Sequence, residues 1–174
     1  MTAPVIDTPR LLLRPPTMDD AAGITEYAMD PEVSRYVTWP RHRSPSDALA
    51  YLKYAISAAE KGQELTWIIT LRASGEVIGT AAIRLQGHRV ELGYVLKRSS
   101  WGQGFATEAA RAIVEWALMQ PTIHRAWAVC DVQNVASVKV LEKIGMQREG
   151  LLRRWAALED FGTPRDCWCY ARVK

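Results

Sequence analysis

The segment RSSWGQGFATE, residues 98–108, has the residues best suited to binding a phosphorylated ligand. Gly102 and Gly104 lie between an apolar run that ends at Leu96 and a stretch with helical periodicity. Glycine allows a positive φ and lets the backbone approach a ligand closely. The free amides of a helix start, aided by the helix dipole, then form a phosphate site. The spacing predicts a phosphate-binding turn, and nearby positive charge comes from Lys97, Arg98 and Arg111.

Two common nucleotide-binding motifs fit this segment poorly. A Walker A loop requires Gly-Lys-Ser/Thr, whereas Gly104 is followed by Phe105 and Ala106. A Rossmann fingerprint requires a third glycine, and that position holds Thr107. A glycine-rich strand-to-helix turn without a ligand is the alternative on this segment alone.

The elements that must position this turn follow from the periodicity of apolar residues. Short apolar or alternating runs between turn residues predict strands, and apolar positions three or four apart predict helices. The sequence ASGE at 73–76 predicts a tight hairpin. The predicted strands are 10–14, 64–71, 77–85, 90–96, 123–130, 147–158 and 166–173, and the predicted helices are one that begins after Thr17 and those at 45–61, 104–119 and 136–144.

This order, β-α-α-β-β-β-α-β-α-β-β, predicts the class of fold. Three consecutive strands with tight turns form an antiparallel meander before the glycine-rich turn, which disfavours a parallel nucleotide-binding sheet. Helices mixed with a mostly antiparallel sheet indicate an α/β three-layer or α+β domain. A length of 174 residues suits one domain, which we expect to span 1–174 with its core at about 8–172.

Four motifs in this order resemble the GNAT superfamily of N-acetyltransferases. The turn WGQGFA at 101–106 is similar to the family signature Gln/Arg-x-x-Gly-x-Gly/Ala, with Trp101 in place of the usual first residue. The segments TPRLLLRP at 8–15, ELGY at 91–94 and NVASVKVLEKIGM at 134–146 resemble those of one branch. That branch contains the ribosomal-protein alanine and serine N-terminal acetyltransferases. The resemblance covers nearly the whole chain.

The resemblance implies a GNAT fold, with a mostly antiparallel central sheet of about seven strands that is splayed between strands 4 and 5 and flanked by four helices. It implies that acetyl-CoA enters the splay, with its pantetheine arm beside the main chain of Tyr94, Val95 and Leu96. Asn134 would contact the pantetheine or act as a turn residue, and Ser137 would contact the thioester region or cap the helix. The pyrophosphate would lie on the amides of Trp101, Gly102, Gln103, Gly104, Phe105, Ala106 and Thr107.

The implied reaction is direct attack of a primary amine on the acetyl thioester in a ternary complex. The amine must be neutral, so a base or a water chain must take its proton. Among Glu91, Glu26 and Asp166 we prefer Glu91, because it lies on the strand that guides the cofactor. An ordinary solvated strand residue is the alternative interpretation of Glu91. A main-chain amide near Leu96 is expected to stabilise the oxyanion.

The thiolate that leaves needs an acid, or release to solvent. Ser137 is the hydroxyl expected near the thiol. Many relatives have a tyrosine acid where this chain has Leu141, and some have a glutamate where it has Ala156. A mechanism that depends mostly on positioning is therefore one alternative. A non-catalytic acyl-CoA sensor or regulatory domain of the same fold is another.

The acceptor is expected to bind beside the first two helices and the last strand pair. The aromatic loop YVTWP brings Tyr36 and Trp39 to this region, where rings line a pocket or contact an amine cation. Core packing is the plainer interpretation for Trp67 and Trp116. Acidic groups here favour a cationic acceptor and basic groups a carboxylate-bearing one, so both a protein N-terminus and a small amine stay open. The charged residues concerned are Glu26, Asp30, Glu32, Glu159, Asp160 and the group Arg41-His42-Arg43.

Composition and charge disfavour several other classes of function. A net charge of +3 without a basic tract disfavours nucleic acid as a partner. Cys130, Cys167 and Cys169, with three isolated histidines, indicate neither a disulfide scaffold nor a metal site. The N-terminus does not resemble a signal peptide, and no apolar run approaches about 20 residues. We expect a cytoplasmic monomer or homodimer without a membrane partner.

Overall fold

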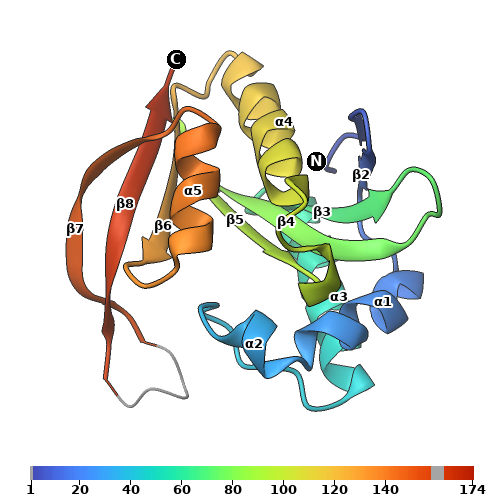
Figure 1. Ribbon diagram of the computed structural model, residues 1–174. Coiled ribbons are helices and arrows are strands. Elements are labelled where there is room, and N and C mark those ends of the chain that lie inside the picture. The colour runs from blue at the N-terminus through green and yellow to red at the C-terminus, as the bar shows by residue number, and fades with distance from the viewer. Residues whose placement is uncertain (1, 158–162) are drawn as a thin grey trace.

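The computed structural model describes residues 2–157 and 163–174, and its centre is one eight-stranded sheet (Figure 1). The strand order is β1-β2-β3-β4-β5-β6-β8-β7. Neighbouring strands are antiparallel except β5 and β6, which run parallel. The strands are β1 (Ile6–Asp7), β2 (Leu11–Arg14), β3 (Glu64–Leu71), β4 (Val77–Gln86), β5 (Arg89–Leu96), β6 (Arg125–Asp131), β7 (Gln147–Ala156) and β8 (Arg165–Val173).

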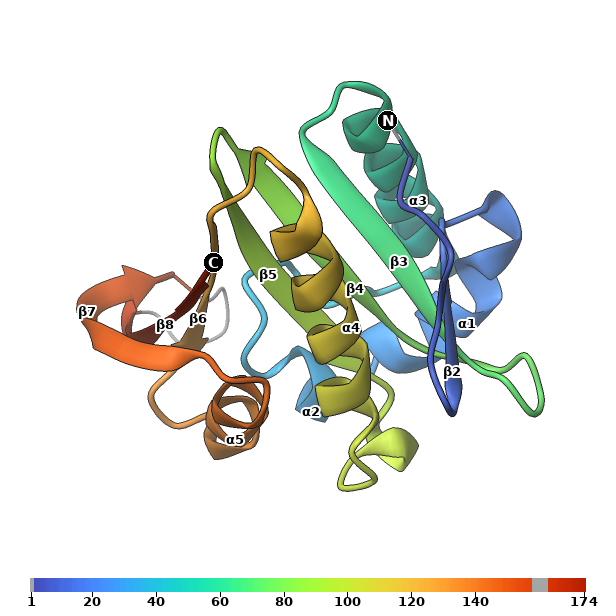
Figure 2. The same ribbon diagram turned by 90° about the horizontal axis from the view of Figure 1, so that it is seen from above.

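Helices cover both faces of this sheet. Figure 2 shows α4 and α5 on one face, and α1 and α3 on the other. Helix α3 contacts β3, and α4 contacts β2, β5 and β6. Within the described ranges, every helix is too short or too polar to cross a membrane. The helices are α1 (Ala21–Ala28), α2 (Pro31–Ser34), α3 (Pro45–Glu60), α4 (Phe105–Met119) and α5 (Val135–Lys143), with the short 3-10 helices η1 (Met18–Asp20) and η2 (Arg98–Ser100).

The parallel pair of β5 and β6 is joined only where the two strands begin. The last pair along the strands joins Glu91 to Trp127. Beyond it, β5 continues beside β4 as far as Leu96, and β6 continues beside β8 as far as Asp131. The two strands therefore diverge, and both Figure 1 and Figure 2 show them apart at their ends. The predicted splay is confirmed, and it lies between β5 and β6.

Apolar clusters fix the helices to both faces of the sheet. Trp67 of β3 is fully buried, and its ring meets that of Trp116 of α4 edge to face, with 5.6 Å between the centroids. Such aromatic pairs add about 0.5–1.5 kcal/mol beyond the burial of their area. The core interpretation of these two tryptophans is confirmed. On the opposite face, Ile24 of α1 and Leu52 of α3 pack with Ile68 of β3.

The seven predicted strands and four predicted helices all form, with shifts of a few residues at their ends. The strand β1 and the helix α2 are additional, and their two and four residues are too few for a periodic pattern. The helix expected directly after Thr17 starts as the 3-10 turn η1. The strand predicted at 147–158 ends at Ala156, and residue 158 lies outside the described residues.

A buried carboxylate, that of Asp20, ties β2 to the start of α1. It accepts hydrogen bonds from Arg14 Nη1 at 2.9 Å and from the Thr17 amide at 2.8 Å, and only 4% of the residue is exposed. Burial alone would raise the pKa of Asp20, but the bonds to Arg14 and Thr17 outweigh it and hold the pKa below its usual value. A carboxyl with a lowered pKa stabilises the fold above its unfolded pKa of about 3.9, and this contribution disappears as the pH falls through the folded-state pKa.

Asp20→Asn is expected to lower the free energy of unfolding by roughly 3 kcal/mol at pH 7, because Arg14 loses its partner in a partly buried pair. Urea unfolding at pH 7 and at pH 3 measures the effect, and the gap between variant and wild type should shrink at pH 3. Asp19→Asn is the matched control, since Asp19 is an exposed residue of the same short helix. Equal stability of the two variants at pH 7 would contradict the assignment.

Candidate functional site

The glycine-rich turn joins the end of β5 to the start of α4. Gly102 and Gly104 have φ values of 75° and 81°, so both occupy the left-handed region that glycine favours. Gly104 is the N-cap of α4, and its carbonyl accepts the bond from the Glu108 amide at 3.0 Å. The amides of residues 105–107 precede that bond and point out of the helix end, where the positive end of the dipole favours an anion.

A brace from the N-terminal segment holds this turn. Glu108 accepts hydrogen bonds from Thr8 Oγ1 at 2.7 Å, from the Arg10 amide at 2.9 Å and from Arg10 Nε at 2.7 Å. Arg10 Nη1 also donates to the Gln103 carbonyl at 2.9 Å, and its guanidinium lies 4.5 Å from the centroid of the Phe105 ring. The brace therefore offsets the negative charge of Glu108 beside the helix N-terminus and fixes the backbone of the turn.

Lys97, one of the cations expected to serve this turn, is occupied by two carboxylates. Its Nζ lies 2.6 Å from Glu26 Oε1 and 2.9 Å from Glu76 Oε1. The structure therefore corrects the expectation that Lys97 adds uncompensated positive charge, because α1 and the turn before β4 both reach it. Arg111 Nη2 donates to the Lys143 carbonyl at 2.7 Å, which ties α4 to the end of α5.

The main chain of β5 alternates between β4 and the splay. The Lys97 amide donates to a β4 carbonyl at 2.7 Å, so the ladder turns the main-chain groups of Leu96 and Tyr94 toward the splay. The Leu96 carbonyl accepts a hydrogen bond from Trp101 Nε1 at 2.8 Å. By the same alternation, the main chain of Val95 faces β4. A molecule in the splay therefore meets the Leu96 amide and the main chain of Tyr94.

Two hydroxyl groups meet at the splay. The side-chain oxygens of Tyr94, on β5, and Ser137, in the first turn of α5, lie 2.8 Å apart. Burial raises the pKa of Tyr94, against the opposing effect of the Ser137 bond, so the phenol stays protonated. The Ser137 hydroxyl also reaches the thiol of Cys130 at the end of β6, where burial raises the thiol pKa to about 12. The cluster is therefore one of neutral proton donors.

The start of α5 is capped by Asn134. Its Oδ1 accepts a hydrogen bond from the Ser137 amide at 3.1 Å. Asn134 is therefore the N-cap of α5, whereas Ser137 is not the cap, because Asn134 fills that position three residues earlier. Contact of Asn134 with the pantetheine stays a prediction. Leu141, where many relatives have a tyrosine, is 1% exposed and packs in the core. Ala156, where some have a glutamate, is likewise buried.

Glu91 lies at the vertex of the splay. It belongs to the last β5–β6 pair, is partly exposed, and accepts a hydrogen bond from Gln86 Nε2 at 3.2 Å. The other two candidate bases have partners elsewhere. Glu26 is in the ion pair with the lysine described above, and Asp166 Oδ1 accepts the Arg154 amide at 2.7 Å. Glu91 is the one of the three that belongs to β5 at the splay, and its role as a base stays a prediction.

Trp39, named as an acceptor residue, lies on the face of the sheet that α1 and α3 cover. It packs against the cluster that α1 and α3 form there, and its ring centroid is 5.3 Å from that of His42. The His42 ring is also 6.5 Å from that of Tyr51. Burial lowers the pKa of His42, so its imidazole is neutral at pH 7. The loop therefore presents a group of rings with a neutral histidine among them.

Tyr36, the other residue named for the acceptor, connects α2 to the last strand pair. The centroid of its ring lies 5.4 Å from the guanidinium of Arg35 and 5.6 Å from that of Arg165. Arg165 Nε in turn lies 2.7 Å from Asp131 Oδ2, and the side chain of Asp131 is only 2% exposed. The two segments expected to line the acceptor thus meet. Two further acidic residues named in that expectation, Glu159 and Asp160, lie outside the described residues.

Sequence patterns do not indicate the roles of Cys130, Asp131 and Arg165. Asp131 ends β6 and Arg165 begins β8, and they meet because the antiparallel register pairs Asp131 with Cys167. The usable signal was local: a charged residue directly after the apolar strand of residues 123–130. The partner of Asp131 could not be found locally, because β6 pairs with β8 and the segments α5 and β7 lie between these two strands in the sequence.

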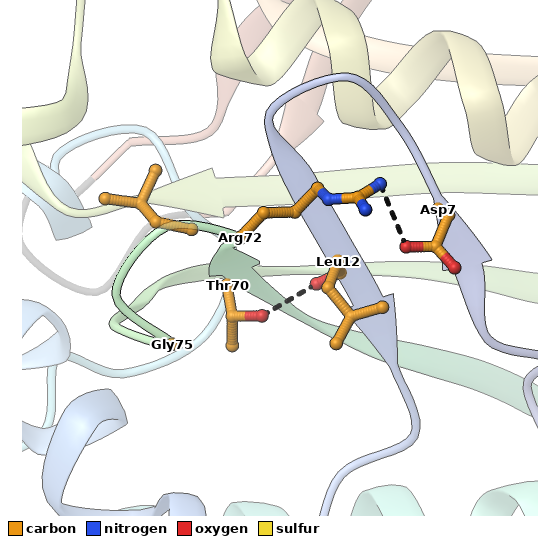
Figure 3. A pocket seen from close by; sticks show the side chains of 6 residues that line it. Asp7, Leu12, Thr70, Arg72 and Gly75 are labelled. Carbon is orange, nitrogen blue, oxygen red and sulfur yellow. Dashed lines mark hydrogen bonds and ion pairs between the residues drawn. The ribbon is translucent and has the colours of Figure 1, made fainter.

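One pocket among the described residues lies away from the splay. A shallow pocket of about 250 Å³ lies at the β1–β2–β3 edge (Figure 3), where Arg72 and Asp7 pair at 3.2 Å and Thr70 Oγ1 donates to the Leu12 carbonyl at 3.0 Å. These polar groups satisfy one another. Among residues 2–157 and 163–174, no three or more His, Cys, Asp or Glu side chains gather to hold a metal ion. The expectation that no metal takes part stays a prediction.

Comparison with known sequences identifies relatives of this chain. Residues 10–147 match a family model described as an acetyltransferase (GNAT) domain. The chain is 32% identical over 174 residues to the N-acetyltransferase YoaA of Bacillus subtilis (strain 168), covering 98% of this chain and 97% of YoaA. It is also 32% identical over 149 residues to the N-acetyltransferase p20 of Bacillus licheniformis, covering 84% of each.

Solved structures share the same fold. A GNAT-family acetyltransferase from Bacillus anthracis has a TM-score of 0.86 at 25% identity, over 98% of both chains. RimJ of Mycobacterium smegmatis, in complex with a CoA disulfide, has a TM-score of 0.83 at 25% identity, over 94% of this chain and 81% of RimJ. The splayed sheet, the glycine turn at the start of α4 and these matches lead to one conclusion: the chain belongs to the GNAT family of acetyltransferases.

Proposed function

We propose that this acetyltransferase binds acetyl-CoA in the splay between β5 and β6 and transfers the acetyl group to a primary amine. One observation carries the proposal: the splay opens beside the N-terminus of α4. A single ligand that fits both features needs a phosphate group for the glycine turn and an extended amide-bearing arm for the edge of β5. Coenzyme A has both, and the CoA disulfide in the similar RimJ structure supports the assignment.

The pyrophosphate would lie on the amides of residues 102–107, with the exposed Arg98 nearby. The Trp101 amide, which was also expected to bind it, instead donates to the Arg98 carbonyl at 3.1 Å. The pantetheine amides would pair with the main-chain groups of Tyr94 that face the splay, which leaves the Leu96 amide, whose carbonyl is already bonded to Trp101, for the thioester. Asn134 uses its Oδ1 to cap α5, and its amide nitrogen is a donor for a pantetheine carbonyl. This arrangement would bring the acetyl thioester close to the hydroxyls of Tyr94 and Ser137.

In the reaction, the C–N bond forms between the amine and the acetyl carbon, and the C–S bond breaks. Glu91 takes the proton of the amine through water. The Leu96 amide donates to the oxyanion that develops on the carbonyl oxygen. Ser137 gives its hydroxyl proton to the departing thiolate and takes one from the phenol of Tyr94, which is protonated at neutral pH and regains its proton from solvent. The proton that the amine loses at Glu91 is thus balanced by the one that the thiol gains.

A screen for thiol release tests this function. Acetyl-CoA is offered with alkyl amines, aminoglycosides, amino acids and peptides with free N-termini, and the free thiol of CoA is measured. Turnover with one class of amine supports the enzyme and identifies its acceptor. Stabilisation by acetyl-CoA without turnover on any amine would instead favour a non-catalytic acyl-CoA sensor. The absence of both would refute the proposal.

Arg10→Ala is expected to weaken acetyl-CoA binding about tenfold, because the loss of charged hydrogen bonds frees the Gln103 carbonyl and leaves Glu108 unneutralised beside the pyrophosphate. The KM is measured for acetyl-CoA and for acetyl-pantetheine, which lacks the pyrophosphate. The increase in KM should be confined to acetyl-CoA. Arg72→Ala is a matched control, since Arg72 pairs with a carboxylate at similar exposure, 50% against 48%. An equal rise with both donors would assign Arg10 to the fold alone.

A further inference from the structure

The side chains of β5 divide between the two faces of the sheet. Leu92 and Leu96 pack in the core that includes α4, whereas Val95 packs against the cluster of α1 and α3. Successive residues of a strand point to opposite faces. Position 93 and Glu91 therefore lie on the same face as Val95, away from α4 and α5.

Gly93 leaves a bare place on that face. The residue is exposed, and a Cβ atom built on it would meet no atom within 4 Å. Its cross-strand neighbour on β4 is Ala82, which is also small. Gly79, on the same strand as Ala82, shows the opposite case, because its Cβ would lie 2.2 Å from the Val95 carbonyl oxygen. Packing thus explains why position 79 is glycine, and nothing within the described chain explains it at position 93.

The bare place borders the splay. Gly93 lies two residues beyond Glu91, the last residue of β5 that pairs with β6. The adjacent Tyr94 turns its main chain toward the splay and its side chain toward α5, where it meets Ser137 at 2.8 Å. Helices α4 and α5 and this Tyr94–Ser137 contact occupy one face. On the opposite face, at Gly93, the strand is uncovered, so an acceptor molecule can approach the thioester there.

We infer that Gly93 is the port through which the acceptor amine reaches the thioester. The inference rests on the proposed binding of acetyl-CoA in the splay. The hydrogen atom that glycine carries in place of a side chain provides room for the carbon that bears the amine. Glu91 lies two residues away on the same face, where its carboxylate attracts the protonated amine of the acceptor and takes its proton. The port admits an amine on a branched carbon, such as the N-terminal residue of a peptide, as well as one on an unbranched chain.

A pair of CoA derivatives tests the port without requiring turnover. One is CoA alkylated on sulfur with an acetamide group, which reaches only one bond further from sulfur than the acetyl group does. The other is its N-butyl amide, which extends the ligand along the path of an amine. Wild-type protein is expected to bind both. Gly93→Val is expected to keep its affinity for the acetamide and to bind the N-butyl derivative at least tenfold more weakly.

Gly150→Val is the matched control. Gly150 lies on β7, is exposed, has ordinary backbone angles, and its Cβ would also meet nothing within 4 Å. This variant should bind both derivatives as the wild type does.

A third derivative tests how much room the port has. It is the N-(1-methylpropyl) amide, which is branched next to the amide nitrogen. In Gly93→Ala this derivative should lose more affinity than the N-butyl one.

The outcomes separate this inference from the proposed function. Unchanged binding of both derivatives by Gly93→Val overturns the port, and an equal loss of both overturns it too, because Gly93 would then belong to the coenzyme site. Failure of the wild type to bind either derivative overturns both the port and the coenzyme site. If Gly93→Val selectively loses the N-butyl derivative but no amine is acetylated, the port is supported and only the catalytic part of the proposed function is refuted.

Discussion

Glutamate at position 104 is expected to abolish the thermal stabilisation that acetyl-CoA gives to the wild type. A ligand at about 100 times its Kd stabilises the folded state by about 2.7 kcal/mol. For a chain of this size that corresponds to a rise of roughly 5–10 °C in Tm. Gly104→Glu places a carboxylate and its side chain at the N-cap of α4, where the pyrophosphate is proposed to lie. Repulsion and bulk act together, so millimolar acetyl-CoA should produce no measurable shift.

The control for this variant is Gly75→Glu. Gly75 lies in the hairpin between β3 and β4, has a φ of 73°, and is surrounded by open space. Both variants therefore introduce the same charge and the same strain of a side chain at positive φ, about 1–2 kcal/mol. They differ in their distance from the glycine turn. A full shift in Gly104→Glu, or its loss in Gly75→Glu, would contradict the assignment of the turn.

The turn could be predicted from sequence because its determinants are local. Gly102 and Gly104, the end of β5 and the helical period after position 104 lie within a few residues of one another, and the positive φ of both glycines follows from their type. The same holds for the meander of β3, β4 and β5, whose turns are short. Local pattern was also sufficient for Trp67, since a large apolar side chain in a long apolar run belongs to a core.

Contacts between distant segments could not be predicted in this way. From the sequence, Glu108 is predicted to be an acidic residue in the first turn of a helix. Only the fold shows that Arg10, 98 residues away in the sequence, binds to it. Lys97 looks like a cation for phosphate until Glu26 and Glu76 meet it. Spacing in the sequence predicts which side chains of one helix or strand share a face. Which side chains of different elements meet depends on the order of the strands in the sheet.

Glycines on neighbouring strands show the same limit. Gly79 and Gly93 each interrupt an apolar strand pattern, and sequence alone gives both the same interpretation. In the fold, Gly79 lets β4 approach the backbone of β5, while Gly93 faces open space. A buried glycine of the first kind cannot accept a side chain without moving β5, whereas the second kind can. The difference makes Gly93 useful as a site for substitution.

Removal of the Ser137 hydroxyl is expected to lower kcat about 100-fold with the amine that the thiol-release screen identifies, as for the loss of a general acid. The acetyl-CoA affinity should be unchanged, because the main chain of β5 and the turn of α4 hold the coenzyme in the proposed complex. The cap of α5 also survives in Ser137→Ala, since Asn134 bonds to the amide of residue 137 and not to its side chain. The variant should therefore fold normally.

Conservative variants separate proton transfer from support of the fold. Ser137→Thr keeps a hydroxyl and should retain most of kcat, whereas Ser99→Ala, at an exposed serine of η2, should have no effect. Tyr94→Phe removes the 2.8 Å contact with Ser137 and should lower kcat about tenfold, because the serine then loses the donor that restores its proton. If Ser137→Ala instead raised the KM for acetyl-CoA and left kcat intact, the hydroxyl would bind the coenzyme, and the thiolate would leave the splay without an acid from the protein.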